Sequence, residues 1–327
     1  SDVYNRQALE RNKINDEYRE IKAKIKFLEW LLRSPKKMRQ VVADELEDVK
    51  EKYDDRRRTQ IALIDADQPK AMPLTMRDLI EDKTVWLTIT EDGLAALTSN
   101  DKLPRQSGSE APTWLLKVNT RDTLFLAAEN GMTAAIPVHN VPEANKPSAD
   151  IHLAKISPLS LDDHLACAIT LPPKDERAEE RYLFSVSQLG MVKKSAIADL
   201  PGPTADLFTM VRINEGDRLQ GVFLTDGKSE ILMMAASGMA IRFSEGDVRP
   251  MGLVAAGVMG MKLKEDDQIV GAEIFPTRGE VFIIGSLGTA KRVVTTQFPK
   301  QGRYGQGVVA WKPEKNEKTI GMTINKG

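Results

Sequence analysis

Lysine and arginine side chains recur a few residues after a set of glycines that are spaced along the second half of the chain. The cations that recur in this way are Lys193, Lys194, Arg242, Lys291 and Arg292. Cations at matched positions of a repeat are suited to contact phosphates rather than bases. Most exposed lysines only solvate a surface, but recurrence at one position favours contact with the backbone of DNA along a common rim.

Two glycine-rich loops, 249–260 and 301–308, add a second kind of candidate site. Small residues let backbone N–H groups approach a phosphate, an arginine supplies a charged fork, and a tyrosine offers a planar face. Neither loop has the residue order of a nucleotide-binding P-loop. The further residues that we expect to contact DNA are Arg249, Gln301, Arg303, Tyr304 and Lys312.

The elements that must position these residues are predicted β-strands. From Thr84 on, a run of strand formers, a few turn residues and a glycine recur, with the glycines roughly forty to sixty residues apart. The runs are 85–89, 123–126, 182–186, 231–234 and 281–284, and the glycines that follow are Gly93, Gly131, Gly190, Gly238 and Gly288. Each glycine suits a hairpin turn that needs positive φ. A sheet of this kind cannot bury both faces alone, so residues 84–327 predict a mainly β fold: about five four-stranded antiparallel blades in a propeller-like ring or spiral.

The first sixty residues predict helices instead. A seam of apolar residues in steps of three and four runs from Ile14 to Leu32, which requires a partner helix. Ser34-Pro35 then provides an N-cap and a proline at the first helical position of a second helix. The short connection predicts an antiparallel hairpin, in which the seam packs on the second helix or on another helix of the arm. The domains predicted are a helical coiled-coil arm over 1–62, a linker over 63–83 and a β-domain over 84–327.

Composition excludes several classes of protein. The net charge of −1 provides no global basic field, so DNA contact must come from local patches. The single cysteine, Cys167, excludes an internal disulfide and suits a reducing cytoplasm. Three histidines are too few for an obvious metal cluster, and His139 and His164 are predicted to lie in loops. No apolar run of membrane length occurs, so we expect a cytoplasmic, nucleoid-associated protein with no membrane partner.

Several separate segments resemble the A subunits of bacterial type IIA DNA topoisomerases. The segments 9–14 and 51–61 resemble the end of the breakage–reunion domain of gyrase A, the five β copies resemble blades of its C-terminal β-pinwheel, and Arg249-Pro250-Met251-Gly252 with Gly257-Val258 resembles a blade-four loop. The resemblance implies a domain that bends or wraps double-stranded DNA and presents it for ATP-dependent strand passage. It further implies an A-subunit homodimer, a B-type subunit that carries the ATPase, and Mg and ATP as cofactors of the parent enzyme, with none bound to this part.

Departures from that family are equally specific. Gyrases carry a Gln-Arg-Arg-Gly-Gly-Lys-Gly box in the first blade, and the matching stretch, 101–110, lacks it; the nearest similar stretch is 301–307, in the fifth copy. A sixth blade is absent from residues 1–327. The resemblance implies that the catalytic tyrosine and the metal-binding carboxylates belong to other domains of the parent enzyme, and no tyrosine of this chain lies in such a motif.

Three alternatives therefore stay open. The loops of copies four and five favour gyrase, whereas loss of the box favours a topoisomerase IV type of domain that acts in relaxation and decatenation without strong wrapping. A β-propeller scaffold that binds protein through its rim is a different class, against which the matched cations argue. A stand-alone enzyme has little support, because no acid–base or nucleophile constellation is visible.

Overall fold

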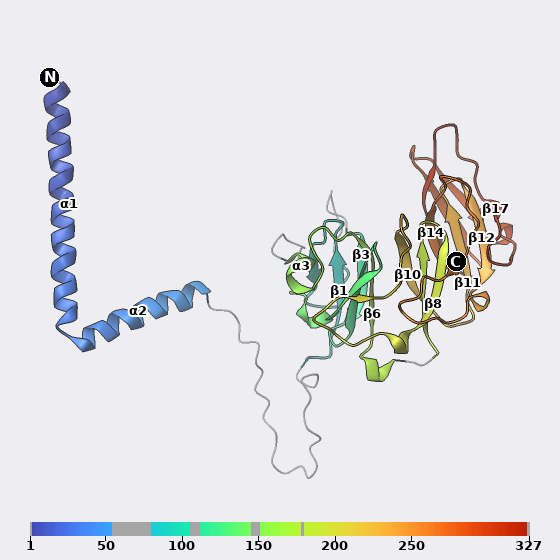
Figure 1. Cartoon of the computed structure of the whole chain (residues 1–327), viewed down its shortest axis with the longest axis horizontal. Coiled ribbons are helices and arrows are strands. Elements are labelled where there is room, and N and C mark those ends of the chain that lie inside the picture. The colour runs from blue at the N-terminus through green and yellow to red at the C-terminus, as the bar shows by residue number, and fades with distance from the viewer. Residues whose placement is uncertain (1, 54–79, 105–111, 145–150, 178–179, 326–327) are drawn as a thin grey trace, which may run out of the picture. The chain divides into compact units, whose positions relative to one another are not determined.

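The computed structural model describes residues 2–53, 80–104, 112–144, 151–177 and 180–325 (Figure 1). These residues form two compact units, one on each side of segment 54–79. The charged stretch 54–58, most of the predicted linker and residues 105–110 of the first-blade stretch lie outside the described residues.

The first unit consists of helices α1 (Asp2–Leu32) and α2 (Pro35–Tyr53). The chain turns at Ser34, whose carbonyl oxygen accepts the amides of Lys37 and Met38 at 3.0 and 3.1 Å, so Pro35 takes the first helical position as predicted. The six seam residues of α1 from Ile14 to Leu32 are 46–70 % exposed. The predicted helices are therefore present, but within this single chain the seam is not buried on α2. Its apolar face is left without a partner among the described residues.

The second unit contains five antiparallel sheets, which we call blades one to five. Figure 1 shows the first four following one another from β1 and β3 to β12 and β17. Blade one has the order β2-β1-β3, blade two β6-β4-β5-β9, blade three β10-β7-β8-β13, blade four β14-β11-β12-β17 and blade five β16-β15-β18. Counted over the described residues, three blades thus have the four strands predicted, and the first and fifth have three.

The strand bounds follow the predicted repeat. They are β1 (Thr84–Ile89), β2 (Ala95–Leu97), β3 (Trp114–Asn119), β4 (Thr123–Ala128), β5 (Met132–Pro137), β6 (Leu165–Leu171), β7 (Tyr182–Ser187), β8 (Met191–Ala196), β9 (Phe208–Thr209), β10 (Leu219–Thr225), β11 (Glu230–Ala235), β12 (Met239–Ser244), β13 (Val258–Met259), β14 (Ile269–Phe275), β15 (Glu280–Gly285), β16 (Ala290–Val294), β17 (Val308–Val309) and β18 (Thr319–Asn325). Short 3-10 turns follow the hairpins, among them η2 (Val138–Asn140), η5 (Ile197–Asp199), η6 (Glu245–Asp247) and η7 (Thr295–Gln297). A short helix, α3 (Leu153–Ile156), and a 3-10 turn, η4 (Lys174–Glu176), complete the unit.

Neighbouring blades exchange strands. The edge strand of blade two, β9, lies in sequence after the blade-three hairpin β7–β8, and β13 and β17 are contributed in the same way to blades three and four. Each of these edge strands has two residues. A repeat is the hairpin of a blade together with the segments that follow it in sequence, and the exchange ties the third, fourth and fifth repeats each to the sheet before it through main-chain hydrogen bonds.

The hairpin glycines have the backbone conformation that the sequence predicts. Gly93, Gly131, Gly190, Gly238 and Gly288 have φ between 78° and 85°. Residues with a Cβ disfavour this region, so the repeated glycine is a requirement of the hairpin turn.

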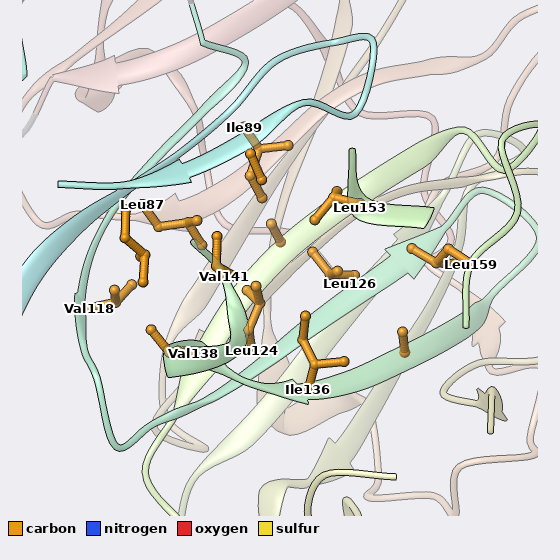
Figure 2. Packing of buried hydrophobic residues seen from close by; sticks show 14 of the residues in the cluster. Leu87, Ile89, Val118, Leu124, Leu126, Ile136, Val138, Val141, Leu153 and Leu159 are labelled. Atoms are coloured by element: carbon orange, nitrogen blue, oxygen red, sulfur yellow. The ribbon is translucent and has the colours of Figure 1, made fainter. Parts of the chain in front are cut away.

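The core lies between the blades rather than within them. The described residues form four apolar clusters, one for each pair of successive blades. Figure 2 shows the first, in which Leu87 and Ile89 of blade one meet Leu124 and Leu126 of blade two. Phe125 points to the other side of β4, into the cluster shared with blade three. Middle strands are therefore buried on both faces, which explains their unbroken apolar runs.

Candidate nucleic-acid interface

Lys193, a predicted DNA contact, lies in the interior of blade three. Its side chain is 1 % exposed, and Nζ donates to the carbonyl oxygens of Met210, at 2.8 Å, and Leu253. Burial lowers the pKa of this ammonium to about 8, and Asp199 opposes the effect. The side chain thus connects two segments, the one that contains Met210 in repeat three and the one that contains Leu253 in repeat four.

Lys194 and Arg242 occupy one matched position in blades three and four, and both reach the following repeat. Nζ of Lys194, which is buried, donates to the carbonyl oxygen of Glu245 at 3.0 Å. Nη1 of Arg242 donates to the carbonyl oxygen of Phe298 at 2.9 Å, and its guanidinium pairs with Glu230 at 2.5 Å. Each side chain thus links a hairpin strand to the 3-10 turn of the next blade.

Blade two has Ala135 at this matched position, and Arg177 takes over the contact from a different place in the chain. Arg177 follows β6, is buried, and its Nη1 donates to the carbonyl oxygen of Leu200 at 2.9 Å. Its guanidinium lies 5.2 Å from the ring centre of Phe125. Sequence analysis missed Arg177 because nothing in the repeat marks its position.

We call these three cation-to-carbonyl contacts, made by Arg177, Lys194 and Arg242, the latches, and the interface between two successive blades a joint. The prediction that Lys193 and Lys194 lie on an outer rim is wrong, because the strand exchange covers β8. Arg242 is half-buried and engaged in the same way. These cations hold blades together.

Lys291 and Arg292, the matched residues of blade five, are exposed. Nζ of Lys291 donates to the carbonyl oxygen of Ala310 at 3.1 Å. Arg292 pairs with Glu280 at 3.3 Å across the hairpin. Both cations stay accessible to a ligand, because such exposed contacts are weak in water.

The glycine-rich loops place their polar residues on the surface. Arg249, Arg303 and Tyr304 are exposed, and Gln301 is half-buried. The main-chain amide of Gln301 donates to the carbonyl oxygen of Arg242 at 2.8 Å. Arg303 donates through Nε to Asp247 and through Nη1 to Met259, both at 3.1 Å to carbonyl oxygens. The two bonds fix the loop of repeat five on that of repeat four and leave Nη2 for a ligand.

A second set of matched cations follows the exchanged edge strands, three residues beyond the end of each. We call Arg212, Lys262 and Lys312 the edge cations; all three are exposed. Within the described part of the chain their side chains form no ion pair or hydrogen bond, whereas the amides of Arg212 and Lys262 bond to Ala255 and Gly305 of the next loop at 3.3 and 2.9 Å. The backbone at Arg212 and Lys262 is thus held beside a joint while the charged groups stay exposed. Only Lys312 was among the predicted residues.

Repeat five carries the densest positive surface. Its exposed cations include Lys300, Lys312, Lys315 and Lys318, in addition to those named above. At the position of Lys315, repeats three and four have Glu215 and Glu265. Local potential is therefore most positive around repeat five although the chain as a whole is near neutral.

Other kinds of site find no support in the part of the chain that the structure describes. No group of three or more His, Cys, Asp or Glu residues is arranged to hold a metal ion. None of the described helices is long and apolar enough to span a membrane.

The five blades, three of which contain a strand from the following repeat, define a β-pinwheel of the propeller class. The family model described as the DNA gyrase C-terminal domain, beta-propeller, matches residues 181–226, 229–276 and 279–326, which are repeats three, four and five. The DNA gyrase A subunit of Mycolicibacterium smegmatis is 30 % identical over 273 residues, which cover 79 % of this chain and 31 % of that protein. The DNA gyrase A subunit of Haemophilus influenzae is 28 % identical over 259 residues, 76 % of this chain and 28 % of that protein.

Solved structures agree with these matches. The C-terminal domain of DNA topoisomerase IV has a TM-score of 0.66 at 27 % identity, over 76 % of this chain and 79 % of that one. The E. coli ParC C-terminal domain has a TM-score of 0.58 at 11 % identity, over 75 % of this chain and all of that one, a likeness of fold alone. The chain belongs to the family of C-terminal domains of DNA gyrase A and related type IIA topoisomerase subunits. It spans about a third of the length of the curated relatives that it matches.

Proposed function

We propose that the β-unit binds duplex DNA along its row of sheet edges and bends it for strand passage by a type IIA topoisomerase. The observation that carries the proposal is the set of edge cations, one at the end of each exchanged strand, exposed and without a protein partner in the described residues. Phosphates recur along duplex DNA without regard to sequence, so a repeated cation is suited to track the backbone.

Repeat five is the strongest part of this proposed surface. Arg249, Lys291, Arg292, Arg303, Tyr304 and Lys312 retain their proposed roles there and in repeat four because their side chains are exposed. Lys193, Lys194 and Arg242 act indirectly, by fixing the blades that carry the contacts. Acidic turns beside Arg212 and Lys262 weaken the potential at repeats three and four, so we expect a short DNA path centred on repeat five.

The parent enzyme, by family, is a homodimer of A subunits with a B-type ATPase partner, and uses Mg and ATP outside this domain. Gyrase is our proposed parent, because the curated matches above are gyrase subunits; a topoisomerase IV type of domain is the second candidate, because its solved structure superposes over three quarters of the chain. DNA wrapping distinguishes the two candidates. When ligase closes DNA circles that are bound to a wrapping gyrase domain, their linking number changes, whereas on a weakly wrapping domain it does not.

The test of DNA binding is salt dependence. The triple variant Arg212→Ala/Lys262→Ala/Lys312→Ala should weaken binding of a random-sequence duplex equally for all sequences. The slope of log K against log salt should fall by about one unit for each phosphate that the variant no longer neutralises. The control Lys117→Ala/Lys174→Ala/Lys228→Ala removes the same charge from exposed positions elsewhere. Equal slopes in the two triple variants would refute the proposal.

A further inference from the structure

The four joints share matched main-chain hydrogen bonds, and one set of them makes the joints directly comparable. The amides of Ala144, Thr204, Met251 and Gln301 donate at 2.8–3.0 Å to the carbonyl oxygens of Leu97, Ala135, Lys194 and Arg242, respectively. In each pair the acceptor occupies the matched position of the hairpin strand and the donor belongs to the next repeat.

The joint between blades one and two differs from the other three in its directional contacts. Its matched position holds Leu97, an apolar residue, and no latch reaches the next turn among the described residues. Among the described residues, isolated bridges of Leu94 with His152 and of Leu97 with Glu143 stand in place of an edge strand.

The start of the third strand shows the same difference. Amides at the start of β10, β14 and β18 donate to the preceding blade at 2.8–2.9 Å, and their donors are Leu219, Ile269 and Thr319. In the described residues no such bond joins the start of β6 to blade one.

The first joint is held by its apolar cluster, by main-chain hydrogen bonds, and by the ion pair of Lys83 with Glu143, whose side chains are 3.6 Å apart and 30 % and 55 % exposed. The amides of Leu97, Ala144 and Leu153 donate to the carbonyl oxygens of Pro142, Leu97 and Gly93 at 3.1, 3.0 and 2.9 Å, respectively. Apolar contact is non-directional, and an exposed ion pair is weak. Rotation of blade one on blade two therefore breaks fewer directional contacts than rotation at the latched joints, where the latch and the bond at the start of the third strand must break as well.

We propose that the joint between blades one and two is the hinge of the β-unit, and that Arg177, Lys194 and Arg242 lock the other three joints into one rigid arc. The hinge follows from contacts inside the protein and does not depend on the proposed DNA binding. Under that function, it would let blade one change the direction in which DNA leaves the arc.

Hydrogen exchange of the 327-residue chain without DNA tests the proposal, read at the four matched amides. Ala144 should exchange fastest. In Lys194→Leu, Met251 should exchange at least about tenfold faster, because a hydrogen bond from a charged donor contributes more than the factor of ten requires. Thr204 and Gln301 should not change, and neither should the amide of Ile283, inside blade five, which monitors global unfolding.

Two further variants keep the test decisive. Lys194→Arg retains a charged donor and should keep Met251 protected, and Arg177→Leu should release Thr204 alone. Unchanged protection of Met251 in a folded Lys194→Leu protein would show that Lys194 is not a latch. Ala144 protected as well as the other three amides in the unmodified protein would show that the first joint is not a hinge. Neither result would bear on DNA affinity, which is measured separately.

Discussion

The guanidinium of Arg242 lies over the ring of Phe275, with Cζ 4.2 Å from the ring centre, and continues across the joint to the carbonyl oxygen of Phe298. A half-buried cation held on an aromatic face keeps its fork pre-organised for that acceptor. The matched residue of blade five, Arg292, has neither contact, and its side chain is 71 % exposed. The two arginines form a matched pair for measuring what the joint adds to stability.

Arg242→Met should lower the free energy of unfolding by roughly 1–3 kcal/mol, because the Phe298 carbonyl loses its charged donor and Glu230 loses one of two cations. Arg292→Met should change it by less than about 0.5 kcal/mol, since its ion pair is exposed. Urea unfolding of the two variants gives both values. Equal effects would mean that the joint contact adds nothing.

The hairpin glycines provide a second matched pair. A Cβ at Gly238 would overlap the carbonyl oxygen of Trp311, where the exchanged segment passes the turn, whereas a Cβ at Gly288 meets nothing. Both glycines have positive φ, so Gly288→Ala should cost about 1 kcal/mol from backbone strain alone. Gly238→Ala should cost more than about 2 kcal/mol, because backbone must also move. Thermal unfolding that ranks the two variants in the opposite order would contradict the strand exchange at this turn.

The sequence predicts the parts of this fold that depend on neighbouring residues, and it does not predict the parts that depend on residues far apart in the chain. The hairpins were predictable because a strand run and a glycine with positive φ are local features. The exchange was not, because two-residue strands such as Phe208–Thr209 are too short to show a period. The burial of Lys193 was also hard to predict. The sequence signal for it is that Lys193 aligns with two apolar residues of other copies, Ala134 and Ile241.

The candidate site was predicted in part for a similar reason. Aligning the copies on the acidic turns after β9 and β13 would have found Arg212 and Lys262, because both stand at the same distance before those turns. Arg177 could not be found in this way, since it substitutes in space for a residue that blade two lacks at Ala135. A contact of this kind depends on the path of a loop in space, and no regular spacing of residues in the sequence indicates it.

Cys167 should report the opening of the joint between blades two and three. Its thiol is buried, donates to the carbonyl oxygen of Val222 at 3.3 Å, and has its pKa raised to about 12 by burial. At pH 8 it should react with a disulfide reagent at least about a thousandfold more slowly than an exposed thiol, because burial both blocks access of the reagent to the sulfur and leaves little thiolate. The exposed site Thr296→Cys gives the reference rate in the same chain. Comparable rates for the two thiols in folded protein would show that the joint opens freely.

Lys193 should make stability depend on pH in the alkaline range. Its pKa is about 8 in the folded protein, against the ordinary value of 10.5, because burial penalises the charged ammonium. Between these two values the unfolded chain binds a proton that the folded chain has released. The free energy of unfolding should therefore rise with pH from about 8 to 10.5, by up to about 1.4 kcal/mol per pH unit from this group.

The two carbonyl bonds of Lys193 survive deprotonation, since a neutral amine keeps two N–H donors for the oxygens of Met210 and Leu253. Lys193→Met removes the titrating group at similar volume, so its stability should follow the remaining groups and lack this rise. Urea unfolding at about pH 7.5, 8.5 and 9.5 compares the two proteins, and the difference between them should grow at each step in favour of lysine. A constant difference would place the lysine ammonium in contact with water, against the burial that sets its role in the blade.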